Sequence, residues 1–446
     1  MEAHRHIPII YNLFPRLAGP MSNWHQHAAR AADMGFNWLF INSIHYPGFS
    51  GSLYAVKHHY RVNPDFLASD DKVDGLAVLE RTLSELRDLG LWTMMDLVIN
   101  HTSRDCPLVK EHPDWYVHDE QGEIASPFAR DPDDLEKVTV WGDLAEIDNS
   151  GSRERELLWS YWAELVKRYL RLGFKGFRCD AAYKIPAKLW RYLVEEAASV
   201  DPEAVFFAET LGCTEEEALD LHGAGLHYFF NSSKWWDFEQ PWCLEQHEIF
   251  GKIAPSISFP ESHDTTRLAA DTGGNQAIQR QRYAFASVFS AGLMIPIGYE
   301  FGFKKRLDVV STRPDDWEEI SLDLRQFIGR INLLKLAHPL LHGEGAFRTV
   351  SKDASVLVLE RRTEQAPSQV GWVVVNKSWD KSAPVDVSKI IVISPRHHLH
   401  RVCRDDAPPH GVPLAGHTLL LDPAEVVLLL ESKQSKDDNL SGGSVA

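Results

Sequence analysis

The first three quarters of the chain alternate between short apolar runs and longer amphipathic stretches, and this alternation constrains the fold more than any other feature. Such alternation is typical of β/α units built on a parallel sheet. Eight units of each kind favour a (β/α)8 TIM barrel, an α/β fold that needs ~250 residues and tolerates insertions. The predicted strands are 7–14, 37–44, 92–100, 173–180, 205–210, 226–231, 255–260 and 293–299. The predicted helices are 23–34, 73–88, 153–172, 186–199, 214–221, 239–250, 275–289 and 319–336.

Two regions depart from this alternation and predict additional parts. The segment between the third strand and the third helix is long, irregular and rich in Asp, Pro and Gly, which is typical of a functional insertion. Farther along the chain, short strands without a long helix predict an antiparallel C-terminal β domain, with strands at 355–360, 370–376, 383–387, 390–393 and 426–431. We therefore expect a barrel in two parts (1–101 and 151–346), a small inserted subdomain (102–150), a C-terminal β domain (347–431) and a disordered tail (432–446).

Composition and charge exclude several classes of partner. With 46 Lys and Arg against 63 Asp and Glu, the formal net charge is −17, which does not attract nucleic acid or anionic lipid. The apolar runs are far shorter than the ~18 to 20 residues of a membrane helix, and the N-terminus lacks the apolar core of a secretory signal. The five cysteines are scattered without a CxxC pair, so neither a zinc site nor a disulfide framework is predicted. We expect a cytoplasmic protein with no nucleic-acid or membrane partner, and its oligomeric state stays open.

Acidic residues accompany the carboxyl ends of four predicted strands. They are Asp96, Asp180, Glu209 and Asp264. Barrel active sites are built at this end of the strands, so these side chains are expected to line one pocket. Arg178 and Asp180 should point the same way because strand side chains alternate, and in an acidic pocket the arginine would keep Asp180 ionised.

Several carboxylates around one pocket suit two kinds of chemistry. Retaining glycoside hydrolysis uses a pair ~5 to 5.5 Å apart, in which one carboxylate attacks the anomeric carbon and the other protonates the leaving oxygen. Crowding of like charges raises one pKa and keeps a protonated acid near neutrality. The alternative is a metal site, which would bring further His or Asp ligands and a phosphate-binding loop, but the sequence has no GxxxxGK[ST] motif. Taken singly, each acid also suits a structural role as a helix cap or ion-pair partner.

Five short segments resemble regions of a known enzyme family. DLVINH, GFRCD, the Glu of FFAET, and SHD resemble the four signature regions of the α-amylase superfamily, and VWGDLAEID resembles the further region before the third barrel helix. The order and spacing agree over about residues 7–345, and the β-rich part that follows is similar to the C-terminal domain of the family. The resemblance implies a glycoside hydrolase of the family 13 type, acting on α-glucosidic bonds.

The resemblance also implies a role for each matched residue. Asp180 would be the nucleophile, Glu209 the general acid/base, and Asp264 the third acid, which binds sugar hydroxyls and helps to distort the ring. Four further residues would line the same subsite: Asp96, His101, Arg178 and His263. Tyr54 matches the aromatic residue that stacks on the sugar, and an aromatic face packs well on the apolar side of a sugar ring. Double displacement would then retain the α configuration.

Other positions differ from the common pattern of the family. Tyr183 and Lys184 stand where many amylases have Lys-His, and Lys184 either contacts a substrate subsite or forms a surface ion pair. The calcium ion of the family often uses a backbone carbonyl here, together with the Asn100 position and acids of the insertion such as Asp143. A calcium site needs six or more oxygen ligands, so we expect no required cofactor or metal, and a structural calcium ion at most.

Three functions are therefore compatible with the sequence. The first is hydrolysis of α-glucosidic bonds in malto-oligosaccharides or related α-glucans through a covalent glycosyl-enzyme intermediate. The second is glucanotransfer or maltosyl transfer to a sugar or phosphate, because the run D-x-x-x-K-I-P and the segment HPDWY resemble the maltosyltransferase branch of the family. The third is an inactive barrel that binds sugar or a protein, which loss of the nucleophile or acid would signal. Trp235 and Trp236, after the sixth strand, are further candidates for sugar contact.

Overall fold

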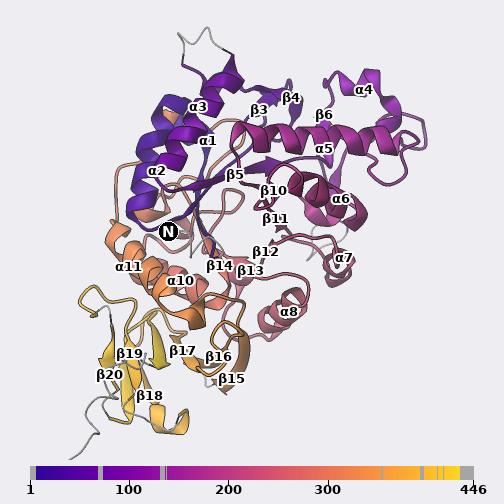
Figure 1. Ribbon diagram of the computed structural model, residues 1–446. Coiled ribbons are helices and arrows are strands. Elements are labelled where there is room, and N and C mark those ends of the chain that lie inside the picture. The colour runs from indigo at the N-terminus through magenta and orange to yellow at the C-terminus, as the bar shows by residue number, and fades with distance from the viewer. Residues whose placement is uncertain are drawn as a thin grey trace, which may run out of the picture.

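Eight parallel strands close into a barrel at the centre of the fold (Figure 1). The computed structural model describes residues 7–68, 74–130, 136, 138–352, 355–391, 396–408, 410–414 and 416–431. Around the barrel the strand order is β1-β14-β13-β12-β11-β10-β5-β2. The strands are β1 (Ile9–Leu13), β2 (Trp38–Ile41), β5 (Trp92–Leu97), β10 (Gly176–Cys179), β11 (Val205–Glu209), β12 (Tyr228–Phe230), β13 (Ser256–Ser258) and β14 (Gly292–Pro296). The predicted barrel is confirmed, and each of these strands overlaps its predicted range.

The interior of the barrel is a packed core of inward-facing side chains. One buried cluster fills it, made of Ile10, Trp38, Phe40, Met94, Phe207, Phe230, Ile257, Phe259 and Met294. Residues that alternate with these, such as Ile9, Leu39 and Met95, belong to a larger cluster that includes the helices. This division follows from the two-residue period of a strand. Burial on both faces also explains why the barrel strands are nearly continuous apolar runs in the sequence.

Helices surround the barrel and connect its strands. Those that match predicted ranges are α2 (Trp24–Asp33), α3 (Gly75–Asp88), α5 (Arg155–Leu172), α6 (Ala187–Ala198), α7 (Glu215–Asp220), α8 (Trp242–Gly251), α10 (Gln276–Phe289) and α11 (Arg325–Ala337). Their ends follow local signals: the Asp74 side chain caps α3, and Gly173 adopts a left-handed conformation after α5. The α11 helix begins later than predicted, because the amides of Leu322 and Leu324 bond to carbonyls of the 3-10 turn at Tyr299–Phe301. None of the helices in the described part of the chain has the length and apolar character that crossing a membrane requires.

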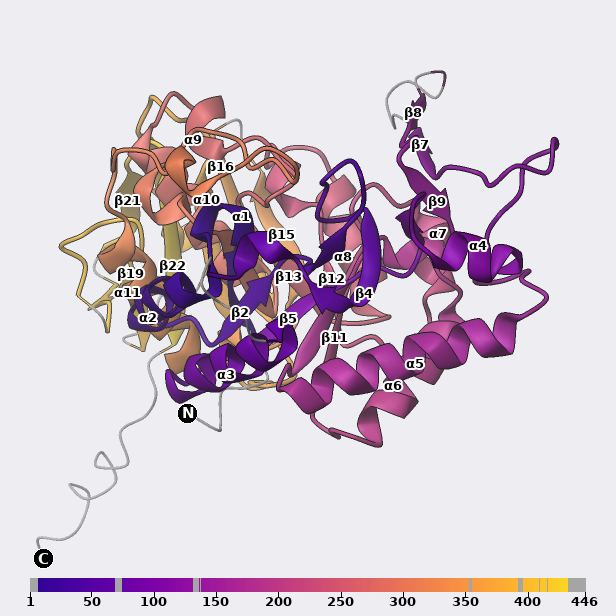
Figure 2. The same ribbon diagram turned by 90° about the horizontal axis from the view of Figure 1, so that it is seen from above.

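Two long loops at the carboxyl side of the barrel carry additional strands. After β2, the strands β3 (His45–Pro47) and β4 (Val56–Val62) form an antiparallel hairpin that the sequence did not predict. After β5, an insertion contains two further strand pairs, β6 (His101–Ser103) with β9 (Leu144–Glu146) and β7 (Phe128–Arg130) with β8 (Val138–Val140), and the short helix α4 (Leu108–Glu111). The insertion extends away from the barrel (Figure 2). At its end, the Asn149 amide donates a hydrogen bond to the Ile99 carbonyl at 2.7 Å.

The C-terminal part of the chain is an antiparallel β structure, as predicted. One sheet has the order β15-β16-β17-β22-β19-β20, and β18 pairs with β21. The strands are β15 (Ala346–Lys352), β16 (Val356–Arg362), β17 (Gly371–Asn376), β18 (Ala383–Asp386), β19 (His397–His400), β20 (Val412–Pro413), β21 (Thr418–Leu421) and β22 (Val426–Glu431). The strand predicted at 390–393 is wrong at Ile390 and Ile391, whose amides bond to the Val387 carbonyl in a turn. Residues 392–393 and the predicted tail at 432–446 lie outside the described residues, and the four boundaries between the five predicted segments remain a proposal.

Candidate active site

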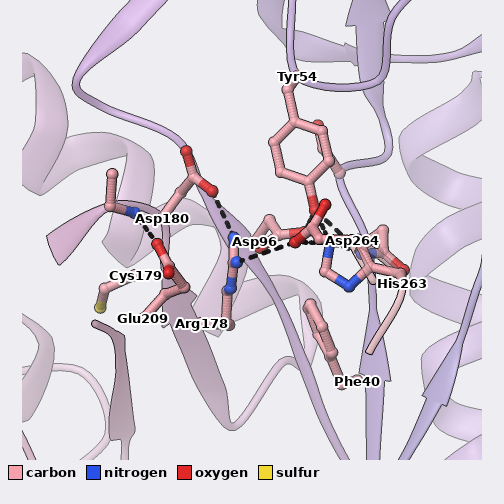
Figure 3. Close-up of polar contacts among 12 residues, drawn as sticks. Phe40, Tyr54, Asp96, Arg178, Cys179, Asp180, Glu209, His263 and Asp264 are labelled. Atoms are coloured by element: carbon pink, nitrogen blue, oxygen red, sulfur yellow. Dashed lines mark hydrogen bonds and ion pairs between the residues drawn. The ribbon is translucent and has the colours of Figure 1, made fainter. Parts of the chain in front are cut away.

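The four predicted acids lie at the carboxyl mouth of the barrel (Figure 3). They are Asp96 on β5, Asp180 directly after β10, Glu209 at the end of β11, and Asp264 in the loop after β13. In the parallel register of β10 and β11, Cys179 pairs with Ala208. The next positions along these two strands are Asp180 and Glu209, so strand pairing alone places their backbones side by side.

Arg178 on β10 connects three of these carboxylates. Its Nη1 donates to Asp96 Oδ1 at 2.9 Å and to Asp180 Oδ1, and its Nη2 lies 3.8 Å from Asp264 Oδ2. Burial alone would lower the pKa of Arg178, but the charges of Asp96 and Asp180 raise it well above its ordinary value. The planar guanidinium therefore stays charged and fixes the relative positions of the acids. Cys179 packs in the outer core, as strand alternation predicts.

Glu209 is held by two backbone amides and keeps its proton to a higher pH than an ordinary carboxyl group. Its Oε2 accepts a hydrogen bond from the Ala181 N–H at 2.9 Å, and its Oε1 accepts one from the Leu211 N–H at 2.7 Å. Burial raises the pKa of Glu209 to about 7; Arg178 acts in the opposite direction, and the charge of Asp180 adds to the rise. Near neutral pH, Glu209 is therefore able both to donate and to accept a proton.

Ala181 links the two neighbouring acids through the backbone. It directly follows Asp180 and adopts a left-handed conformation, with φ 40° and ψ 51°. A residue with a side chain rarely adopts this conformation, and such strain concentrates at functional sites. Here the conformation accompanies an N–H that points at the Glu209 carboxyl group. The strand end that carries Asp180 thus also positions Glu209.

Asp264 has the opposite ionisation behaviour to Glu209. Burial would raise its pKa, but the neighbouring His263, Arg178 and Arg306 outweigh this and lower the pKa of Asp264 to about 2. Its Oδ2 lies 3.0 Å from His263 Nε2, and the side chain remains half exposed at the mouth. The site therefore combines one carboxyl group that holds a proton near pH 7 with another that is ionised over the whole working range.

Tyr54 and His263 form a polar group with Asp96, on the side of Arg178 that faces away from Glu209 (Figure 3). The Tyr54 hydroxyl donates to Asp96 Oδ2 at 2.8 Å and lies 2.7 Å from His263 Nε2, and the two rings are nearly parallel. The Asn42 amide donates to the Tyr54 oxygen at 3.0 Å. Sequence reasoning missed Asn42, although it is a polar residue just after a buried strand, the same signal that identified the acids.

His101 and Lys184 are less closely joined to this group. His101 Nε2 contacts the Tyr54 backbone carbonyl at 3.1 Å, and burial lowers the pKa of His101. Lys184 is about half exposed; its ammonium lies 3.4 Å from Glu217 and over the Tyr183 ring. The structure therefore brings together Tyr54, Asp96, Arg178, Asp180, Glu209, His263 and Asp264. His101 lies at the Tyr54 backbone carbonyl and interacts electrostatically with Asp180, and Lys184 pairs with a glutamate outside the group.

The positions that the resemblance connects with calcium do not assemble a cation site. The Asn100 Oδ1 is buried without a hydrogen-bond partner, which is the kind of atom a cation would use. However, no three His, Cys, Asp or Glu side chains in the described ranges are grouped so that they could hold a metal ion. Ca²⁺ takes six to eight oxygen ligands, and a cluster of carboxylates for such a site is not gathered in the described residues. We derive no chemical step through a metal.

The arrangement has the elements required for double displacement at a sugar carbon. One acid can donate a proton near neutrality, a second carboxylate lies on the neighbouring strand, and an arginine fixes the second one in place. Retaining glycosidases use such a pair of carboxyl groups. Asp264, ionised and half exposed, is available to accept hydrogen bonds from sugar hydroxyls.

Comparisons with known proteins find enzymes whose names refer to α-glucans. The family model "Glycogen debranching enzyme, glucanotransferase domain" matches residues 7–121. An α-1,4-glucan:maltose-1-phosphate maltosyltransferase of Burkholderia pseudomallei is 27% identical over 369 residues, which cover 80% of this chain and 32% of that protein. The protein of the same name from Picrophilus torridus is 25% identical over 337 residues, which cover 69% of this chain and 49% of that protein. The chain thus spans about a third of the length of the first of these curated relatives and about half of the second.

Solved structures share the fold over nearly the whole chain. An α-amylase of Geobacillus thermoleovorans, solved with acarbose, has a TM-score of 0.73 at 17% identity, with 96% of this chain and 99% of that chain covered. An α-glucosyl transfer enzyme has a TM-score of 0.74 at 16% identity, with the same coverage. These likenesses establish the architecture, a TIM barrel with a C-terminal β domain. The chain is thus similar in sequence to maltosyltransferases and to a glucanotransferase domain, and similar in fold to α-amylases and an α-glucosyl transfer enzyme.

Proposed function

We propose that the protein acts on α-glucosidic bonds of malto-oligosaccharides or related α-glucans by a retaining mechanism with a covalent glycosyl-enzyme intermediate. In this proposal Asp180 is the nucleophile, Glu209 the general acid/base and Asp264 the third acid. The remaining residues bind the sugar in the same subsite or at its edge: Tyr54, Asp96, His101, Arg178, Lys184 and His263. A cytoplasmic location and the lack of nucleic-acid and membrane partners stay predictions.

One observation carries the proposal. Asp180 and Glu209 occupy adjacent strand ends, and the amide that directly follows Asp180 donates to the Glu209 carboxyl group at 2.9 Å. The two carboxyl groups therefore face the same small region of the barrel mouth (Figure 3). A pair of acids in which one accepts a hydrogen bond from an arginine and the other keeps its proton near pH 7 supports nucleophile and acid roles, respectively.

The reaction then proceeds in two displacements. Asp180 attacks the anomeric carbon while Glu209 gives its proton to the glycosidic oxygen, so the leaving sugar departs as an alcohol and an ester forms on Asp180. Glu209, now a carboxylate, takes a proton from the incoming water or acceptor hydroxyl, which displaces Asp180 from the sugar. Each displacement inverts the anomeric carbon, so the product keeps the α configuration.

The acceptor in the second step separates hydrolysis from transfer. Hydrolysis uses water, whereas glucanotransfer or maltosyl transfer uses another sugar or phosphate. Transfer is a candidate in its own right because the two relatives are named as maltosyltransferases and the family model as a glucanotransferase domain. The third candidate, an inactive sugar-binding barrel, is disfavoured because an aspartate and a glutamate are both present at adjacent strand ends of the barrel mouth.

Product analysis tests these candidates directly. The protein is incubated with maltose, maltotriose and longer maltodextrins, with and without phosphate. Shortened products alone mean hydrolysis, lengthened products mean transfer, and a sugar phosphate identifies phosphate as an acceptor. NMR of the earliest product should show the α anomer, and a β anomer would refute double displacement. No turnover of any of these substrates, while they still bind, would favour the inactive barrel.

A further inference from the structure

Arg16 is a buried cation on the carboxyl side of the barrel that the proposed mechanism does not use. It lies on the short helix α1 (Pro15–Ala18), just after β1, and is only 4% exposed. Burial lowers the pKa of Arg16, and the positive charge of Arg313 acts in the same direction. Placing a guanidinium here therefore costs free energy, which its hydrogen bonds have to offset.

The guanidinium of Arg16 bonds to three segments that are far apart in the sequence. Its Nε donates to the Val309 carbonyl at 2.8 Å, its Nη2 donates to the Gly51 carbonyl, and its Nη1 donates to Asp65 Oδ2 at 3.2 Å. Val309 belongs to the loop after β14 and Gly51 to the loop between β3 and β4, while Asp65 lies in the 3-10 turn at Pro64–Phe66. Because β14, β1 and β2 are neighbours in the barrel, one side chain next to β1 reaches the loops on both sides.

The same contacts hold the turn that leads to Tyr54. The Val309 carbonyl that accepts from Arg16 also accepts from the N–H of Leu53 at 3.2 Å. Leu53 is fully buried and directly precedes Tyr54 in the sequence. Two residues earlier, Gly51 adopts a left-handed conformation with φ 75°, and its carbonyl accepts from Arg16 Nη2. The turn is therefore fixed on both sides, by one guanidinium and by the acceptor that it shares.

The loop after β14 keeps its own shape through hydrogen bonds within it. The Asp308 carboxylate accepts from the amides of Val310 at 2.9 Å and Ser311 at 2.6 Å. Arg313 Nη1 donates to the Val310 carbonyl at 2.8 Å. These bonds surround Val309 in the chain, so its carbonyl offers a fixed point to which the neighbouring turn is attached.

Tyr54 ends this turn (residues 51–54) and points from it toward the proposed sugar subsite (Figure 3). Its hydroxyl donates to Asp96 at 2.8 Å and lies 2.7 Å from His263 Nε2, and its ring is nearly parallel to the His263 ring. These short contacts tolerate little displacement, because hydrogen bonds are rarely longer than about 3.2 Å. A shift of the turn would therefore displace the ring that the proposed function places against the sugar.

We propose that Arg16 is a positioning residue for Tyr54: by holding the turn at 51–54 against the loop after β14, it sets where the Tyr54 ring meets the sugar. The inference rests on the proposed function, because it requires Tyr54 to contact the substrate. Arg16 acts through Tyr54 and is not itself a catalytic residue. The role suits arginine, since its planar fork presents several N–H donors in fixed directions, whereas lysine has a single nitrogen.

A double-mutant cycle measures this coupling in the full-length protein. With maltohexaose as the substrate, Arg16→Met should lower kcat/KM roughly 10-fold, mainly by raising KM, because small misplacements of positioning groups reduce rates by up to ~100-fold. In a Tyr54→Ala background the same substitution should lower kcat/KM by less than about 2-fold, since the group that Arg16 positions is gone. Arg16→Lys, which also serves where Arg16→Met does not fold, should recover only part of the loss.

Hydrogen exchange measured by mass spectrometry tests the contact without any turnover. The peptide that spans residues 48–56 should exchange its amide hydrogens faster in Arg16→Met than in the parent protein, because the turn opens more often. Arg280→Met is the matched control: it removes a guanidinium that joins α10 to the C-terminal part of the chain through the Cys403 carbonyl and Asp405. It should change neither the exchange of this peptide nor kcat/KM.

Two results would overturn the inference. The first is equal hydrogen exchange in residues 48–56 with and without the Arg16 guanidinium. The second is an equal fold loss of kcat/KM with Tyr54 present and with Tyr54 replaced, which would make Arg16 a general structural residue. Failure of the proposed function looks different: the parent protein would turn over no maltodextrin, while hydrogen exchange would still show whether Arg16 holds the turn.

Discussion

The Glu209→Gln variant should gain stability relative to the parent protein as the pH rises from about 4.5 to about 7. Burial raises the pKa of Glu209 from 4.5 to about 7 in the folded protein, while the unfolded chain keeps the ordinary value. Between these two values the folded state binds more protons than the unfolded state, so the free energy of unfolding of the parent falls as the pH rises. A difference of about 2.5 pH units corresponds to roughly 3 kcal/mol.

The glutamine in this variant does not titrate, so the pH-dependent loss of stability disappears. Its amide oxygen can still accept from one of the Ala181 and Leu211 amides, and the other amide loses its acceptor. That loss costs about 1 kcal/mol and does not change with pH. The variant-minus-parent difference in unfolding free energy should therefore rise by roughly 3 kcal/mol between about pH 4 and pH 8.

Urea denaturation followed by tryptophan fluorescence, repeated at closely spaced pH values, measures this difference. Glu120→Gln, which changes an exposed glutamate of the insertion, is the matched control and should give a flat difference. A flat difference for Glu209→Gln as well would refute the reasoning, because burial would then not set the ionisation of Glu209. The same ionisation predicts that kcat/KM of the parent falls above about pH 7, as the general acid loses its proton.

Five further outcomes are expected. Asp180→Asn should lower kcat by on the order of 10³-fold or more, with an unchanged circular dichroism spectrum, and near-parental activity would refute the nucleophile assignment. The Asp180→Asn substitution should also lower the pKa of Glu209, because the Asp180 charge contributes to its rise. The pH above which the residual activity falls should therefore be lower in this variant than in the parent protein. Arg178→Met leaves the buried Asp96 carboxylate without its cation and should cost about 3 to 5 kcal/mol of unfolding free energy in urea titrations. Trp38→Ala removes a fully buried ring from the barrel interior and should lower the free energy of unfolding by about 3 to 5 kcal/mol in the same urea titrations. Prolonged EDTA treatment should leave activity unchanged.

The barrel could be predicted from sequence because its strands are short, continuous apolar runs that lie between amphipathic helices. Burial on both faces makes such strands easy to recognise in the sequence, and the end of α5 at Gly173 and the start of α6 after Pro186 follow local chemistry. The β3–β4 hairpin could not be predicted in this way. Its longer strand, β4 (Val56–Val62), reads VKHHYRV and alternates poorly between buried and exposed positions. It is held by pairing with β3 and by the Tyr169 hydroxyl, which donates to the His59 carbonyl at 2.7 Å across a long sequence separation.

The acids of the site were predictable because one rule, polar residues at barrel strand ends, finds them all. Strand alternation also predicted that Arg178 would face Asp180, and the two side chains are hydrogen-bonded. Other features depend on contacts between distant segments. Sequence spacing gives no sign that Trp379, in a turn of the C-terminal sheet, lines the same hollow as Asp264, nor that Lys184 pairs with Glu217. Such placements follow only once helices and sheets have packed.

The left-handed backbone conformation of Ala181 lowers stability, and it also positions the amide that donates to Glu209. A glycine there would relax the strain and fold at least as well, yet it would hold the amide that points at Glu209 less firmly. Selection for thermal resistance alone would thus favour substitutions that position Glu209, the proposed acid, less well. Selection for turnover would instead preserve the locally unfavourable conformation of Ala181. In laboratory evolution of this protein, the position after Asp180, the proposed nucleophile, is where selection for stability and selection for activity should first favour different residues.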